Sequence, residues 1–175
     1  MTYPDPAVIA AVAEAFVPLR VDFRDPHFRE LNVVWLPTVI VRDHRGNEHY
    51  RNVNAVPAPD FLDVLALGEA HARLKEGRSA AHARAEQVLA HALGRRDDGP
   101  LHPELLYWQA IAGYFRGDHD GEFRDGVWGE LMRRYPDSIW AHRVPEFLDR
   151  WAAHHRSVQA AARRAHRRSQ MPLDR

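Results

Sequence analysis

Residues 32–43 read Asn-Val-Val-Trp-Leu-Pro-Thr-Val-Ile-Val-Arg-Asp, and this is the most informative segment of the chain. Pro37 stands directly before a run of β-branched residues, 38–41, which is the composition of a strand. Proline cannot donate a ladder hydrogen bond, so within sheets it is confined to edges, bulges and strand beginnings. We therefore predict that a strand begins just after Pro37. Because this strand is almost continuously apolar, we expect both of its faces to be covered.

The residues before this strand predict two helices and a further strand. Asp5-Pro6 pairs an N-cap acceptor with proline at the first helical position, and Asp25-Pro26 repeats that signal. Between the two helices, residues 17–23 alternate apolar and polar side chains, which indicates a strand.

The residues after the strand predict a hairpin and then helices. Asp43-His-Arg-Gly46 is a turn sequence, and residues 48–53 follow as a more polar strand. Pro57-Ala-Pro-Asp60 begins a long helix that Gly77 ends, in the place where glycine is favoured. The remaining sequence reads as helix around a polar linker at 94–100, with helical segments at 79–93, from Pro103, at 122–134 and from Ser138.

Composition limits the classes of function. The 175 residues carry no net charge, so the whole protein has no general attraction to nucleic acid or acidic lipid. The absence of cysteine excludes disulfides, thiolate zinc sites and thiol nucleophiles formed by these residues. No apolar run approaches the roughly 20 residues that span a bilayer. Residues 1–6 lack the pattern of a signal peptide. We expect a soluble, cytoplasmic protein that does not bind membranes.

The segment Val34-Trp35-Leu36-Pro37-Thr38 resembles the cis-proline loop of the thioredoxin family. The order of elements supports this resemblance, which covers about residues 3–76. The matching segments are the strand at 17–22, the strand at 39–41, the hairpin turn at 43–46 and the helix start at 59–62. The resemblance implies an α/β protein with an N-terminally incomplete thioredoxin-like fold in residues 1–76.

The second part of the chain resembles the helical, tetratricopeptide-like extension of some bacterial thioredoxin-family proteins. Large, small and aromatic residues fall near the repeat pattern of about 34 residues, at Trp108, Ile111, Phe115, Trp128 and Pro136. Arg124 stands where that pattern has alanine, so the repeat is degenerate. We expect an all-helical extension over residues 77–170, packed on the sheet, and a disordered tail at 171–175.

The chain departs from the family at its N-terminus. In the family, a central strand and a Cys-x-x-Cys motif precede the first helix, and the redox chemistry needs both cysteines. Three arrangements follow. The strands at 19–23 and 38–41 pair directly, or a strand from another chain lies between them, or the natural protein begins upstream of Met1.

Residues Trp35, Leu36, Pro37 and Thr38 are the candidate peptide-binding site. The family resemblance implies a cis peptide bond before Pro37 and a loop backbone, at Leu36, that pairs with an extended peptide. Trp35 has two readings: a wall of the peptide groove, or a buried core residue.

Other patterns carry less information. Several histidines form close pairs in the sequence: His82 with Glu86, His71 with Lys75, and His154 with His155. None of these pairs has a third potential ligand at the spacing of a metal site, so we expect solvent-facing histidines and no bound metal. Residues 118–122 faintly resemble a calcium loop without its key glycine and glutamate. We expect no cofactor.

The sequence therefore predicts a redox-inactive, thioredoxin-like protein that binds a polypeptide through the cis-proline loop or the helical extension. One alternative is a truncated thiol-disulfide oxidoreductase whose cysteines lie upstream of Met1. A second is a nucleic-acid binder that uses the arginines between Arg156 and Arg168. Homodimerisation through an exposed sheet edge is a further expectation.

Overall fold

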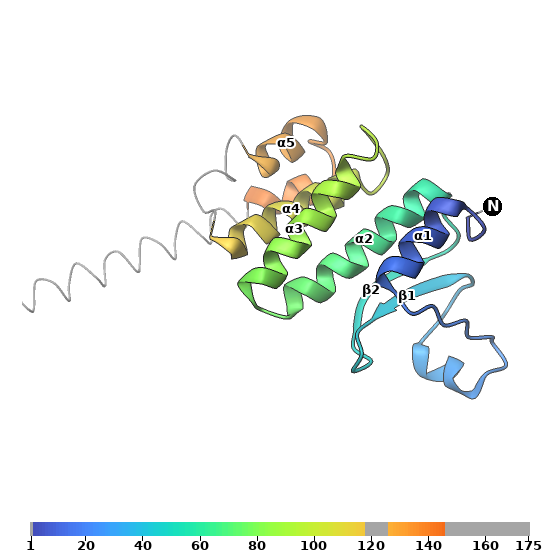
Figure 1. Ribbon diagram of the computed structural model, residues 1–175. Coiled ribbons are helices and arrows are strands. Elements are labelled where there is room, and N and C mark those ends of the chain that lie inside the picture. Colours follow the sequence, from blue (N-terminus) through green and yellow to red (C-terminus); the bar gives the residue numbers. More distant parts are fainter. Residues whose placement is uncertain (1, 118–125, 146–175) are drawn as a thin grey trace, which may run out of the picture.

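A computed structural model describes residues 2–117 and 126–145 (Figure 1). The described chain is a mixed α/β structure that is mostly helical and has one two-stranded sheet. Its elements are α1 (Pro6–Ala15), the 3-10 helix η1 (Pro26–Leu31), β1 (Thr38–Arg42), β2 (Glu48–Val53), α2 (Ala58–Lys75), α3 (Ser79–Leu93), α4 (His102–Arg116) and α5 (Val127–Arg134). Residues 139–145 are also helical.

The predicted hairpin is confirmed. β1 and β2 pair antiparallel, with Val39 opposite Asn52 and Val41 opposite Tyr50. The turn is held by Asp43, whose carbonyl accepts from the Gly46 amide at 2.9 Å. Gly46 has a φ of 84°, a left-handed conformation that glycine adopts without steric cost.

The hairpin has helices on one face. α2 crosses that face closely, since a Cβ on Gly68 would lie 2.5 Å from Cγ2 of Val41. α1 packs beside α2, where Val8 joins Phe61 and Leu65 in a buried cluster. On the opposite face, Arg51 Nη2 donates to the carbonyl of Leu31 at 2.8 Å and holds the end of η1.

The predicted strand at residues 17–23 is wrong. The described residues 16–22 have no regular secondary structure, and the sheet formed by the described residues contains only β1 and β2. Val17 is 96% exposed and Leu19 is 85% exposed. An alternating sequence becomes a strand only when a neighbour accepts its backbone hydrogen bonds. The direct pairing of residues 19–23 with β1 is therefore excluded as well.

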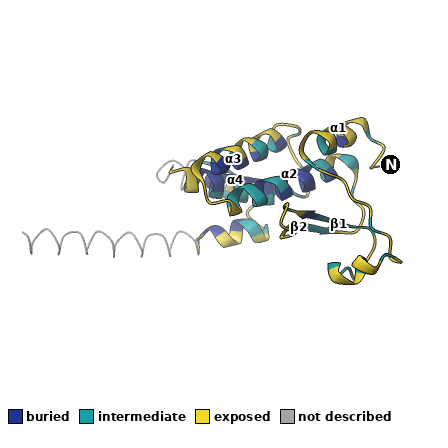
Figure 2. Ribbon diagram, turned by 60° about the horizontal axis from the view of Figure 1, so that its bottom comes forward, coloured by how far each residue is buried: buried dark blue, intermediate teal, exposed yellow. Residues whose placement is uncertain are grey.

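The expectation that both faces of β1 are covered is also wrong. Only Val41 of this strand is buried, and Thr38, Val39 and Ile40 are half-buried. Figure 2 shows buried residues gathered on α2, α3 and α4, whereas the segment between α1 and η1 is largely exposed. Cover for β1 comes mainly from α2.

The main core lies among the helices. Leu67 and Ala70 of α2 pack with Leu89 of α3 and Leu105 of α4 in one cluster, and Tyr50 of β2 packs against it. Residues on both sides of position 76 thus share one core. A second cluster joins α4, α5 and the helical residues 139–145 around the fully buried Trp128.

Sequence signals at the helix ends are confirmed. The carboxylate of Asp5 accepts from the amides of Ala7 and Val8, and the hydroxyl of Ser138 accepts from the amide of Ala141 at 3.1 Å. Gly77 has a φ of 69° just after α2. None of the helices in the described parts of the chain combines the length and the apolar character that crossing a bilayer requires.

Candidate peptide-binding site

The four predicted site residues form one loop at the start of β1. The Leu36–Pro37 peptide bond is cis, as expected. The Thr38 hydroxyl donates to the carbonyl of Trp35 at 2.6 Å, which closes the loop around the proline. Trp35 is 63% exposed and Leu36 is 52% exposed. The reading of Trp35 as a core residue is therefore wrong, and its ring is available to a partner.

The ladder of the hairpin determines which backbone groups of β1 lack a partner. The Asn54 amide donates to the carbonyl of Pro37 at 2.8 Å. Hydrogen-bonded pairs alternate along an antiparallel ladder, so Val39 and Val41 direct their backbone groups to β2. Thr38 and Ile40 direct theirs to the other side, which we call the outer edge of β1. Among the described residues no hydrogen bond reaches the Thr38 and Ile40 backbone groups at this edge.

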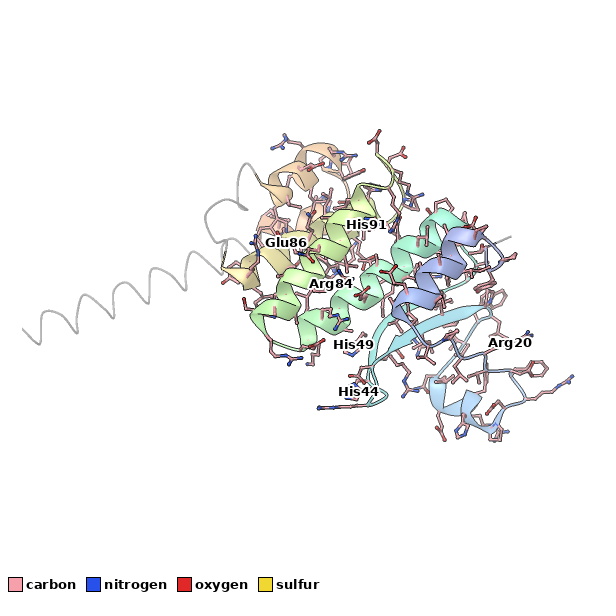
Figure 3. The ribbon with its side chains drawn as sticks, viewed as in Figure 1. Arg20, His44, His49, Arg84, Glu86 and His91 are labelled. Atoms are coloured by element: carbon pink, nitrogen blue, oxygen red, sulfur yellow. The ribbon has the colours of Figure 1, made fainter. Side chains whose placement is uncertain are left out.

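Several apolar side chains that precede β1 in the chain are exposed. Val34 is 88% exposed directly before the loop. Val17 and Leu19 belong to the segment that leads from α1 to η1. In Figure 3, Arg20 of that segment lies at the end of the hairpin opposite the turn that carries His44. The end of the hairpin where β1 begins is thus rich in exposed apolar surface.

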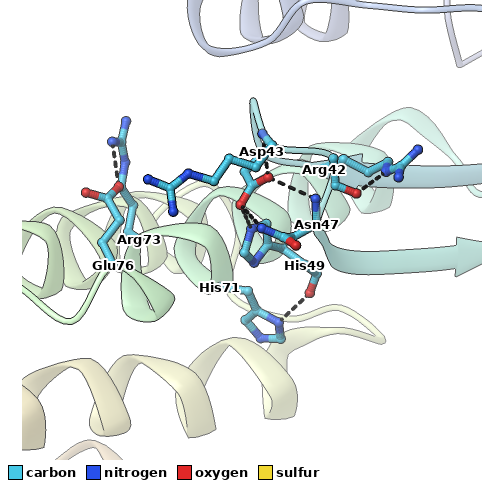
Figure 4. Close-up of polar contacts among 9 residues, drawn as sticks. Arg42, Asp43, Asn47, His49, His71, Arg73 and Glu76 are labelled. Atoms are coloured by element: carbon cyan, nitrogen blue, oxygen red, sulfur yellow. Dashed lines mark hydrogen bonds and ion pairs between the residues drawn. The ribbon is translucent and has the colours of Figure 1, made fainter.

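β2 carries a polar network near the turn of the hairpin. His49 has no partner residue in the register with β1, and its carbonyl lies 3.1 Å from Nδ1 of His71 on α2. The His49 ring is in turn 3.1 Å from Oδ2 of Asp43 (Figure 4). Hydrogen bonds, first from Asn47 and also from His49, hold the pKa of Asp43 far below its usual range.

Sequence reasoning missed a half-buried polar contact between β2 and α4. The Tyr50 hydroxyl donates to Oε2 of Glu104 at 3.1 Å. Burial raises the pKa of Glu104 above its ordinary value, and burial followed by the nearby Glu104 charge raises the pKa of Tyr50. Fifty-four positions separate the two residues, so no local pattern could have identified the pair.

The expectation of solvent-facing histidines is wrong for three of them. His102 is 1% exposed, and its Nε2 lies 3.0 Å from the carbonyl of Arg96. His82 is buried against the ring of Phe115. His71 is half-buried between Tyr50 and Trp108, and burial lowers its pKa. Packing between helices placed these rings inside.

No group of three potential metal ligands comes together within residues 2–117 and 126–145. The calcium-loop-like residues 118–122, the pair His154 and His155, and the arginines from Arg156 onward lie outside the described residues.

An open groove of about 600 Å³ lies at the start of α2. Its lining residues are Pro57, Pro59, Asp60, Arg96, Asp98, Gly99, Pro100 and Tyr135. Arg96 bridges Asp60, at 2.6 Å, and the buried Asp63. The Arg96 guanidinium therefore already pairs with two carboxylates at this groove.

No protein-family model matches the chain, and neither a curated protein nor a solved structure resembles it closely enough to count as a match.

Proposed function

We propose that this protein binds an extended polypeptide, which adds a strand to the outer edge of β1 and crosses the loop formed by Trp35–Thr38. One observation carries the proposal. The backbone groups of Thr38 and Ile40 have no hydrogen-bond partner among the described residues, and exposed Trp35 and Leu36 lie directly beside them. A strand edge of this kind is a template for another chain. The resemblance to the thioredoxin family, whose cis-proline loop contacts extended peptides, points the same way.

The energetics favour a modest affinity. Each backbone hydrogen bond along the edge contributes about 0.5–1.5 kcal/mol net. An exposed aromatic side chain adds apolar contact, and tryptophan is among the residues that dominate binding interfaces. Because these 175 residues contain no cysteine, the role proposed for them is binding without thiol chemistry. The protein is proposed to act as a soluble, thioredoxin-like binding module.

Binding is tested with a fluorescein-labelled peptide in which three valines alternate with threonines and lysines flank the ends. Fluorescence anisotropy measures its affinity for the full chain. Trp35→Ala is expected to weaken binding by roughly tenfold, since a well-packed aromatic contact is worth over 1 kcal/mol.

Two proline variants supply a matched comparison. The ladder directs the amides of both Ile40 and Val53 away from the partner strand, so proline at either position leaves the hairpin hydrogen bonds in place. Ile40→Pro blocks the outer edge of β1 and is expected to abolish binding. Val53→Pro blocks the outer edge of β2 and is expected to retain it. Equal binding by the two variants, or no binding by the wild type, overturns the proposal.

A further inference from the structure

We infer that the polypeptide strand recognised at the outer edge of β1 is amphipathic, with apolar side chains on the face toward α1 and polar or charged side chains tolerated on the face toward η1. This inference rests on the proposed function and adds the chemical class of the partner. It follows from the different surroundings of the two faces of the sheet beside β1.

The first face is formed by α1. This helix has one charged residue, Glu14, and its inward stripe of Val8, Val12 and Phe16 points into the cluster of Phe61. Val8 is buried, but Val12 and Phe16 are only half-buried. An apolar stripe of this kind normally packs fully against a core. The stripe of α1 is therefore covered incompletely by the described residues.

The position of α1 explains this partial cover. α1 packs against α2 and its backbone does not come close to either strand among the described residues, although Val39 of β1 packs against the cluster that contains Val8; α2 contacts both strands. Figures 1 and 2 show α1 beside α2 on the same side of the hairpin. A strand added to β1 would continue the sheet beneath α1. Its side chains on that face would meet Val12 and Phe16, and a charge buried there would have no partner.

The opposite face is mixed, with charged groups beside apolar Ile40. The ladder places Ile40 and Arg51 on this face as a cross-strand pair. Arg51 is paired with Glu48 at 2.6 Å and reaches to the carbonyl of Leu31. η1 itself carries exposed His27, Arg29 and Glu30. A polar or charged side chain of the partner would stay near water and near these groups, so it would cost little.

A glutamate scan of the alternating peptide tests the inference with wild-type protein. Replacing the middle valine by glutamate is expected to weaken binding by at least about tenfold, because it places a charge against α1. Replacing either neighbouring threonine is expected to change affinity by less than about threefold, as for an exposed polar position. Equal losses at valine and threonine positions overturn the inference.

Variants of α1 provide the complementary measurement. Val12→Glu is expected to weaken binding of the valine peptide by at least about tenfold, whereas Ala13→Glu adds the same charge at an exposed neighbouring position and is expected to leave it within about twofold. Circular dichroism checks that both variants fold. If Val12→Glu does not fold, the peptide scan alone decides the question.

Different results would reject the amphipathic partner and the proposed function. If glutamate is tolerated equally at all peptide positions while Ile40→Pro still loses binding, the amphipathic partner is rejected. The proposed function then remains. No binding of any peptide by a monomeric protein rejects the proposed function. If the wild-type protein is a dimer that binds no peptide, and Ile40→Pro makes it monomeric, a second copy of this chain occupies the edge. That result overturns both statements.

Discussion

The Tyr50 hydroxyl on β2 donates a hydrogen bond to Oε2 of Glu104 on α4, 3.1 Å away. This contact ties the hairpin to the helices that follow it. Tyr50 also packs edge-on against His71 of α2, whose ring contacts Trp108 of α4 with 4.2 Å between ring centres. Three elements thus meet around groups that titrate, so the stability of this junction depends on pH.

Glu104→Gln is expected to stabilise the protein at neutral pH. Burial raises the pKa of Glu104 in the folded state, so its favourable contribution is full below the unfolded pKa of about 4.5 and is lost as pH rises through the folded pKa. Glutamine keeps an acceptor for Tyr50 and removes the charge. Urea unfolding at pH 7.5 should show a gain of about 1.4 kcal/mol per unit of raised pKa. No gain at pH 7.5 relative to pH 4 contradicts this account.

His71→Gln is expected to reduce the loss of stability on acidification. Burial lowers the pKa of His71, so the unfolded chain takes up a proton first and stability falls as pH drops below about 6.5. Glutamine retains a donor toward the His49 carbonyl without a titrating group. Urea unfolding between pH 7.5 and 5.5 measures the difference in slope. His91→Gln, at an exposed position of α3 away from this junction, is the control. An unchanged slope in His71→Gln would exclude this role.

Gly68→Ala is expected to destabilise the packing of α2 on β1. An added Cβ would lie 2.5 Å from Cγ2 of Val41, so the helix must move away or Val41 must shift. Overpacking of this kind costs about 1–3 kcal/mol, which exceeds the roughly 1 kcal/mol that alanine contributes to helix propensity. Thermal unfolding measures the loss. In a Val41→Ala background the same substitution should cost less, and an equal cost would show that the two residues are not coupled.

Asp63→Ala is expected to cost about 3 kcal/mol, the scale for breaking a buried ion pair. Asp63 is 1% exposed and accepts from Arg95 at 2.8 Å and from Arg96, so its removal leaves the Arg95 guanidinium without this partner, whereas Arg96 keeps Asp60. Asp98→Ala, at an exposed position between α3 and α4, should stay within about 0.5 kcal/mol. Urea unfolding compares the two variants. If the two variants lose similar free energies of unfolding, the buried ion pairs of Asp63 contribute no more to stability than an exposed carboxylate does.

Local signals predicted the local structure well. The Asp5 cap, the Gly46 turn and the Gly77 helix end act within a few residues, so a short window of sequence contains everything that determines them. The coarse result, a hairpin followed by helices, follows from the same signals. The cis bond before Pro37 is different, because its prediction came from the resemblance of the loop to a known family and not from a local rule.

Contacts between distant residues could not be predicted in this way. Residues 17–23 have the alternation of a strand but lack a strand beside them among the described residues, and pairing is a property of two segments rather than one. The burial of His71 and His102 and the meeting of Tyr50 with Glu104 depend on how helices pack. The helix caps and the turn could be read from the sequence, because their energies are local. The exposure of the outer edge of β1 and the burial of the titratable groups could be seen only in the folded protein, because both depend on neighbours from elsewhere in the chain.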